Sequence, residues 1–184
     1  MFSMVTSSRL GLIALMGLLF APMSQADTTE EFPLLGLGAK YGIDDFSDGH
    51  DIENQAVYAN LGTPWDWQVS DNIRMDTEVQ STLGRYKVDE DYFGYLMFGV
   101  DLRFQYADFP VVVKLGTAPT YLFDDESEEF DAGGPLHMTT HLTVLANPVK
   151  WLDIGVTYQH TSNAGTNKEN PGMDILSLDV SYRF

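Results

Sequence analysis

The most constraining feature of this sequence is an alternation of apolar and more polar side chains along almost the whole chain after residue 33. In one segment, Leu96, Phe98 and Val100 alternate with Gly99 and Asp101. A period of two places successive side chains on opposite faces of a β-strand. The same pattern recurs in segments 35–43, 57–62, 75–83, 96–105, 110–122, 136–144, 152–159 and 176–184. The sequence therefore predicts an all-β protein of about eight strands.

The charged face of these strands bears on the choice between a membrane barrel and a soluble sheet. Eight charged or imidazole side chains share one face of their strands: Asp76, Glu78, Asp101, Arg103, His137, His141, Asp179 and Arg183. In a small membrane barrel that face is the packed polar interior and the apolar face meets lipid. In a soluble sandwich or lipocalin the same face would be turned to solvent. We expect Glu78, Asp101 and Arg103 to pair across strands inside the barrel.

The aromatic residues favour the membrane. One predicted rim carries Trp65, Trp67, Phe109 and Trp151, and the opposite rim carries Tyr86, Tyr92, Tyr121 and Phe123. Aromatic girdles of this kind form where a barrel crosses the two membrane interfaces. The chain also ends on Phe184, which resembles the C-terminal signature of bacterial outer-membrane barrels. We therefore predict an eight-stranded antiparallel transmembrane β-barrel, with a soluble periplasmic β-protein as the alternative.

The predicted connections fall into two sets. Segments 66–72, 106–109 and 147–150 are short, whereas 44–53, 123–134 and 163–172 tend to be longer and more polar. Outer-membrane barrels have short periplasmic turns and longer external loops. The tryptophan rim is thus expected to face the periplasm and the longer loops to face outside.

The N-terminal segment has the pattern of a secretory signal peptide. Arg9 is the only charge before Asp27, and an apolar run extends from Leu10 to Pro22. Small residues around Ala26 then provide a cleavage site. The run is too short to span a membrane comfortably as a mature helix. We predict a signal peptide at 1–26, a barrel domain at 27–184, and export to the Gram-negative outer membrane.

Composition excludes several classes of function. The chain has 27 Asp and Glu against 10 Lys and Arg, a formal charge of −17, and no Cys. An acidic chain is repelled by phosphate backbones, so a nucleic-acid partner is not expected. Without Cys there is no disulfide scaffold, cysteine zinc site or thiol nucleophile.

Three residues with complementary chemistry are predicted on the outer wall of the last hairpin. His160 and Ser162 continue the lipid-facing parity of one strand, and Asp174 has the lipid-facing parity of the next. Residues two apart on a strand lie about 6.5 Å apart along it and point the same way. With a register opposing His160 to Asp174, the three provide the nucleophile, base and orienting acid of a serine hydrolase. A one-residue slip would move Asp174 into the interior.

A plainer interpretation also fits these residues. Polar side chains on the lipid face near the interface cost only about 0–1 kcal/mol, so each of them could be an ordinary residue where a strand leaves the membrane. The combination of a base, a hydroxyl and a carboxylate on one patch favours a site. Because the patch lies on the outer wall, its substrate would lie in the membrane.

The motif itself resembles a known family. His160-Thr161-Ser162-Asn163-Ala164-Gly165, followed by Asn170-Pro171-Gly172 and an acidic residue, is similar to the PagL family of lipid A 3-O-deacylases of Gram-negative outer membranes. The motif is fairly specific, whereas the rest of the resemblance is architectural. It implies hydrolysis of the acyl ester at position 3 of lipid A by a Ser-His-acid triad, without a metal or other cofactor.

The resemblance assigns roles residue by residue. Ser162 matches the nucleophile and His160 the base, while Asn163, Gly165 and Asn170 match positions around the site. The Gly165 N–H and the Asn170 side chain are the candidate oxyanion donors.

The acid is where this chain departs from the pattern. The family's acid is Glu, and this chain has Asp174 at that spacing, one methylene shorter. Glu169 in the preceding loop is a second candidate acid.

Two other clusters have structural interpretations. The acidic run 124–129 lacks the spacing of a calcium loop and is expected to be a solvated outer loop. His137 and His141 are four residues apart on one strand face and are expected in a hydrogen-bonded interior network, since a metal site would need a third ligand.

Two further alternatives have different functions. A non-catalytic structural or adhesive barrel would retain the fold with a decayed motif. An acyltransferase would need an acyl-chain pocket inside the barrel, against which the charged interior argues. The expected partners are lipid A or lipopolysaccharide and outer-membrane lipid, with a homodimer as a further possibility.

Overall fold

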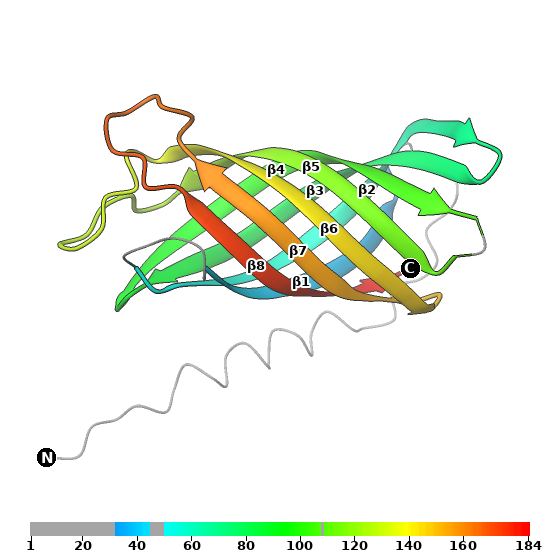
Figure 1. Ribbon diagram of the computed structural model, residues 1–184, viewed down its shortest axis with the longest axis horizontal. Coiled ribbons are helices and arrows are strands. Elements are labelled where there is room, and N and C mark those ends of the chain that lie inside the picture. Colours follow the sequence, from blue (N-terminus) through cyan, green and yellow to red (C-terminus); the bar gives the residue numbers. More distant parts are fainter. Residues whose placement is uncertain (1–31, 45–49, 108) are drawn as a thin grey trace, which may run out of the picture.

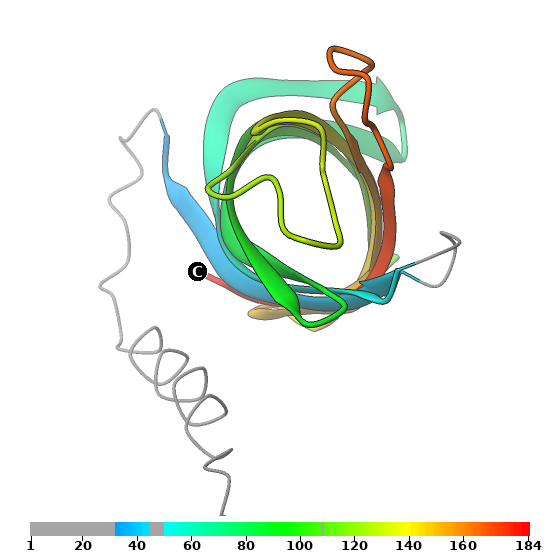
Figure 2. The same ribbon diagram turned by 90° about the vertical axis from the view of Figure 1, so that its left-hand side faces the viewer.

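The protein forms a closed antiparallel barrel (Figures 1 and 2). The computed structural model describes residues 32–44, 50–107 and 109–184. The strands are β1 (Leu34–Asp44), β2 (Ile52–Ser70), β3 (Ile73–Val88), β4 (Asp91–Tyr106), β5 (Val111–Leu122), β6 (Leu136–Val149), β7 (Leu152–Ser162) and β8 (Met173–Arg183). Each strand pairs with its sequence neighbours, and β1 closes the barrel against β8. The predicted fold class is therefore confirmed.

None of the described residues belongs to a helix long and apolar enough to cross a membrane. The predicted signal peptide, 1–26, lies outside the described residues.

The middle of the barrel interior is a network of paired charges. Glu78 and Asp101 are buried, and Lys114 reaches both, with Nζ 2.5 Å from Glu78 Oε2 and 3.5 Å from Asp101 Oδ2. Arg103 Nε lies 3.5 Å from Glu78, and His141 Nε2 lies 3.1 Å from Asp101. The predicted polar interior is thus present, and its charges compensate one another across β3, β4, β5 and β6.

The interior is apolar towards one end, which the sequence analysis did not anticipate. Tyr86 and Tyr95 stack with ring centroids 4.5 Å apart, and Phe93 packs edge-on against Phe130 of the β5–β6 loop. Figure 2 shows this loop, in yellow-green, across the mouth of the barrel. The placement of Tyr86 on an exposed aromatic rim was wrong, because Tyr86 is 1 % exposed. It shares the inward parity of Glu78 on β3.

The two ends of the barrel differ as predicted in most connections. We call the end with the β2–β3, β4–β5 and β6–β7 connections the turn end, and the other the loop end. Trp65, Trp67 and Trp151 are exposed at the turn end. The predicted turn at 66–72 was too long, since β2 continues to Ser70 and only residues 71–72 connect it to β3.

At the loop end one connection is short. Residues 89–90 alone join β3 to β4, and Asp89 there has a φ of 52°. The imidazole of His50 and the N–H of Asp51 both bond the Asp89 carboxylate, at 2.7 and 3.0 Å. The His50 hydrogen bond lowers the pKa of Asp89. Which end faces the periplasm stays a prediction.

Candidate active site on the outer wall

The centre of the candidate site is a cross-strand pair near the loop end of β7 and β8. His160 lies directly opposite Asp174 in the register, and its Nδ1 is 2.9 Å from Asp174 Oδ1. Their side chains are 45 % and 31 % exposed, whereas the flanking Thr161 and Ile175 are fully buried. Strand alternation therefore places both groups on the outer wall. The register is the one that the serine-hydrolase interpretation requires.

This pairing selects one tautomer of a neutral His160 imidazole. A carboxylate only accepts, so in that tautomer Nδ1 carries the proton and Nε2 is the acceptor. No hydrogen bond to His160 Nε2 or to Ser162 Oγ occurs within the described chain. Ser162 follows His160 by two residues on the same face, opposite Met138 of β6. The hydroxyl and the imidazole thus share one patch of the wall.

Two further groups contact Asp174. Tyr158 Oη donates to Asp174 Oδ1 at 2.7 Å, and the Asp174 N–H donates to Asp44 Oδ2 at 3.1 Å. Neither residue was predicted from the sequence as a site residue. Tyr158 could have been found, because it has the same parity as His160 on β7. Asp44 could not, because its place follows only from the β1–β8 register.

The chain turns sharply immediately after Ser162. Thr166 N–H donates to the Asn163 carbonyl at 3.1 Å, and the two intervening residues, Ala164 and Gly165, have φ of 55° and 76°. Positive φ at both central positions with this hydrogen bond is characteristic of a type I′ turn. Glycine adopts it freely, whereas Ala164 is strained. The turn fixes where β7 ends, and so where Ser162 lies.

The carboxamide of Asn163 connects the turn to two loops. Its Oδ1 accepts from the Gly165 N–H at 2.9 Å, and its Nδ2 donates to the carbonyls of Gly133 and Glu169 at 2.9 and 2.6 Å. The predicted oxyanion donor Gly165 N–H is therefore engaged by Asn163 in this structure. Glu169, the second candidate acid, contributes its main-chain carbonyl here. Gly133 was not among the predicted site residues.

The side chain of Asn170 is oriented by the main chain of Asn163. Its Oδ1 accepts from the backbone N–H of Asn163 at 3.1 Å. The amide NH₂ of Asn170 therefore points away from that contact and can donate elsewhere. Of the two predicted oxyanion donors, the Gly165 N–H is bonded to Asn163, whereas the Asn170 NH₂ has no hydrogen bond within the described residues.

With this geometry in place, comparison with known proteins decides the family. A sequence profile described as lipid A 3-O-deacylase (PagL) matches residues 54–183. The chain belongs to the PagL family. The lipid A deacylase PagL of Bordetella bronchiseptica is 52 % identical over a stretch of 31 residues, which is 17 % of this chain and 17 % of that relative.

The PagL fold is also found among solved structures. The crystal structure of the outer membrane enzyme PagL superposes with a TM-score of 0.69 at 14 % identity, over 79 % of this chain and 97 % of that one. At this identity the likeness shows the fold alone. PagL membership and the closed barrel together indicate an outer-membrane location.

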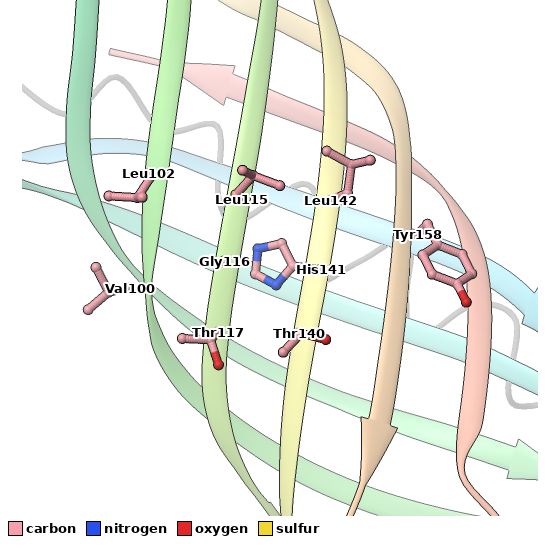
Figure 3. Close-up of a pocket in the computed structure, with 9 residues that line it drawn as sticks. All are labelled: Val100, Leu102, Leu115, Gly116, Thr117, Thr140, His141, Leu142 and Tyr158. Atoms are coloured by element: carbon pink, nitrogen blue, oxygen red, sulfur yellow. The ribbon is translucent and has the colours of Figure 1, made fainter. Parts of the chain in front are cut away.

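An apolar groove adjoins the site on the outer wall of this PagL barrel (Figure 3). It has a volume of about 510 Å³ and is lined from β4 to β7 by Val100, Leu102, Leu115, Gly116, Thr117, Thr140, His141, Leu142 and Tyr158. Tyr158 forms its edge towards β8 and is the residue that bonds Asp174. The groove and the candidate triad are therefore joined through one side chain.

The other predicted clusters lie away from this site. His137 Nε2 contacts the Ala132 carbonyl at 3.0 Å, and His141 contacts Asp101, both inside the barrel as expected. The acidic run 124–129 is exposed or half-buried in the β5–β6 loop. Among the described residues, no group of three His, Asp or Glu side chains is arranged to hold a metal ion.

Proposed function

We propose that this protein is a lipid A 3-O-deacylase of the serine esterase type, with its triad on the outer wall of the barrel. The observation that carries the proposal is the His160–Asp174 pair at 2.9 Å on the outward face, with Ser162 two residues further along β7. Membership of the PagL family supports the choice of lipid A as substrate.

The first half of the reaction forms an acyl-enzyme. Ser162 Oγ attacks the ester carbonyl carbon while His160 Nε2 takes the hydroxyl proton. The tetrahedral intermediate then expels the sugar 3-oxygen, which receives that proton from the imidazolium. Asp174 keeps the imidazole in the Nδ1–H tautomer and stabilises its positive charge. The acyl chain is now esterified to Ser162, and lipid A has a free 3-hydroxyl.

The second half regenerates the serine. Water attacks the acyl-enzyme carbonyl, with His160 again taking a proton and returning it to Ser162 Oγ. The products are a free fatty acid and the resting enzyme. In both halves the carbonyl oxygen becomes negative, and the Asn170 NH₂ is the donor that we assign to it.

The position of the site suits a substrate that remains in the membrane. The triad lies where β7 and β8 approach the loop end, and the apolar groove descends from Tyr158 along the lipid-facing wall. An acyl chain could lie along this groove while its ester reaches Ser162. No acyl pocket inside the barrel is needed, in keeping with the paired charges in the middle of the interior.

The test is mass spectrometry of lipid A after incubation with the purified, detergent-refolded protein and with its Ser162→Ala variant. The wild type should remove one ester-linked 3-hydroxyacyl chain, and the variant, shown to be folded by its heat-modifiable electrophoretic mobility, should remove none. Full activity in Ser162→Ala would exclude this mechanism. A folded wild type without activity on any lipid A would favour the non-catalytic barrel.

A further inference from the structure

We propose that Tyr158 is a positioning residue of this site, whose hydroxyl fixes the Asp174 carboxylate and thereby the imidazole of His160. The inference deepens the proposed hydrolysis and rests on it for the identity of the reaction. Its structural basis is a single oxygen, Asp174 Oδ1, which accepts from Tyr158 Oη at 2.7 Å and lies 2.9 Å from His160 Nδ1.

Two donors on one oxygen restrict how the carboxylate can turn. With His160 alone, the accepting carboxylate oxygen could move along an arc around Nδ1 and keep its hydrogen bond. A second donor on the same oxygen fixes the position of that oxygen, because it must lie within hydrogen-bond distance of both donors. Tyr158 and His160 are two residues apart on β7, so both donors come from one rigid strand. Rigid support of this kind keeps a catalytic group in its productive geometry.

The other neighbours of Asp174 leave this restraint to Tyr158. In the described chain, the titratable groups that contact it are Tyr158 and His160 on β7 and Asp44 on β1. Asp44 accepts from the main-chain N–H of Asp174 and so holds the backbone, but it donates nothing to the carboxylate. Of these three groups, only His160 and Tyr158 can donate to the side chain, and the Tyr158 hydroxyl does so through a charge-assisted hydrogen bond.

The ring of Tyr158 and its hydroxyl have separable roles. The ring is 41 % exposed and lines the edge of the apolar groove, as Figure 3 shows. Replacing Tyr158 with Phe keeps the ring, and therefore the groove, but removes the donor to Asp174. This substitution isolates the hydrogen bond without opening a cavity in the barrel.

The experiment measures lipid A deacylation by the refolded full-length Tyr158→Phe variant. The Tyr121→Phe variant is the matched control. Tyr121 is also outward-facing near the loop end and 47 % exposed, but the contact of its ring is with Phe123. Tyr158→Phe should lower kcat about tenfold with little change in KM, the effect of one lost hydrogen bond to a charged group. Tyr121→Phe should match the wild type.

The pH profile distinguishes positioning from packing. Without the hydroxyl, the carboxylate is more basic and holds the imidazolium proton more firmly, so the acidic limb of kcat/KM should move to higher pH in Tyr158→Phe. A lost packing contact would lower the rate without moving this limb. Wild-type kcat together with an unmoved acidic limb in Tyr158→Phe would overturn the proposal.

A double-mutant cycle provides the second check. Tyr158→Phe should have no further effect in an Asp174→Ala background, because its partner is already gone. An equal loss in both backgrounds would contradict the assigned role.

Labelling of Ser162 by a fluorophosphonate, followed in parallel, reports on the triad without lipid A. A labelling rate that falls in Tyr158→Phe while no variant deacylates lipid A would refute the proposed substrate and support the Tyr158 role.

Discussion

Asp44 and Asp174 are 130 residues apart in sequence, yet the N–H of Asp174 donates to Asp44 Oδ2 at 3.1 Å. The backbone ladder between β1 and β8 ends at the pair of Ile43 with Leu176. The Asp44 side chain therefore takes the place of the next ladder bond and extends the closure of the barrel to the level of the candidate site. Barrel closure and the position of Asp174 are in this way coupled.

This coupling predicts how Asp44 variants behave. Asp44→Ala removes the acceptor and should destabilise the barrel by about 1–2 kcal/mol, because the Asp174 N–H loses its partner. The same change should lower deacylation several-fold, because the acid becomes less fixed. Asp44→Asn retains an acceptor oxygen and should keep most of both properties. Urea unfolding in lipid vesicles and lipid A mass spectrometry measure them, and equal behaviour of the two variants would contradict the prediction.

The deacylation rate should depend more on the negative charge at position 174 than on the length of that side chain. Asp174→Asn cannot stabilise the imidazolium and can hold the wrong tautomer, so kcat should fall by about 10²–10⁴-fold. Asp174→Glu keeps the carboxylate, and we expect at least about a tenth of wild-type activity. Rates on lipid A and the labelling rate of Ser162 should change in parallel. A loss in Asp174→Glu as large as in Asp174→Asn would show that side-chain length decides.

The β5–β6 loop is predicted to support the nucleophile through Gly133. An added Cβ there would overlap the Glu169 carbonyl oxygen and crowd Asn163 Nδ2, and the φ of 79° disfavours any side chain. Gly133→Ala should therefore displace the turn after Ser162 and lower kcat at least about tenfold while the barrel still folds. Gly134→Ala is the matched control, because its φ is 100° but its nearest contact is the flexible Asn167 side chain. Equal losses in the two variants would point to backbone strain alone.

The relation of sequence to structure is clearest on β7 and β8. Alternation alone was enough to predict that His160 and Asp174 lie on the outward face. Side chains at every second position of a strand point to the same face, and directly paired residues of neighbouring strands also share a face. The same parity rule places Tyr86 inside, and the rim assignment failed because it followed residue type rather than parity. Trp65 and Trp67 also alternate with polar neighbours, so the extension of β2 was visible in the sequence although the segment was interpreted as a turn.

Contacts between loops could not be predicted from the alternation of side chains. The Asn163 carboxamide meets the Gly133 carbonyl, 30 residues earlier, through two irregular segments. No periodicity relates these segments, and their approach depends on β5–β6 and β7–β8 connections that meet only once the barrel closes. The engagement of the Gly165 N–H by Asn163 was unpredictable for the same reason.

The interior charges should contribute strongly to stability. Lys114 is 3 % exposed and compensates both Glu78 and Asp101. Lys114→Ala should cost about 3–5 kcal/mol of unfolding free energy, because it leaves buried carboxylates unpaired. Lys87→Ala breaks a half-exposed pair with Glu53, 3.6 Å apart, and should cost less than about 1 kcal/mol. Urea titration of both variants tests this, and similar costs would mean that water screens the interior network.

The tryptophans test where the turn end lies relative to the bilayer. Trp65 and Trp67 stand on β2 beyond Leu61, the last β2 residue in the ladder with β1, and they are 58 % and 49 % exposed. Trp151, in the β6–β7 connection, is 53 % exposed. Indole rings prefer the headgroup region, where the ring is shielded and its N–H stays hydrated.

In single-tryptophan variants refolded into vesicles, each indole should therefore be quenched by lipids brominated near the headgroup and be protected from acrylamide in the water. Trp151 serves as the internal reference, because it lies in a short turn directly below the barrel wall. If acrylamide quenched Trp65 and Trp67 while brominated lipid quenched Trp151, the extended β2–β3 hairpin would project beyond the bilayer into water. If none of the three responded to brominated lipid, the membrane barrel would be wrong and the soluble β-protein would be favoured.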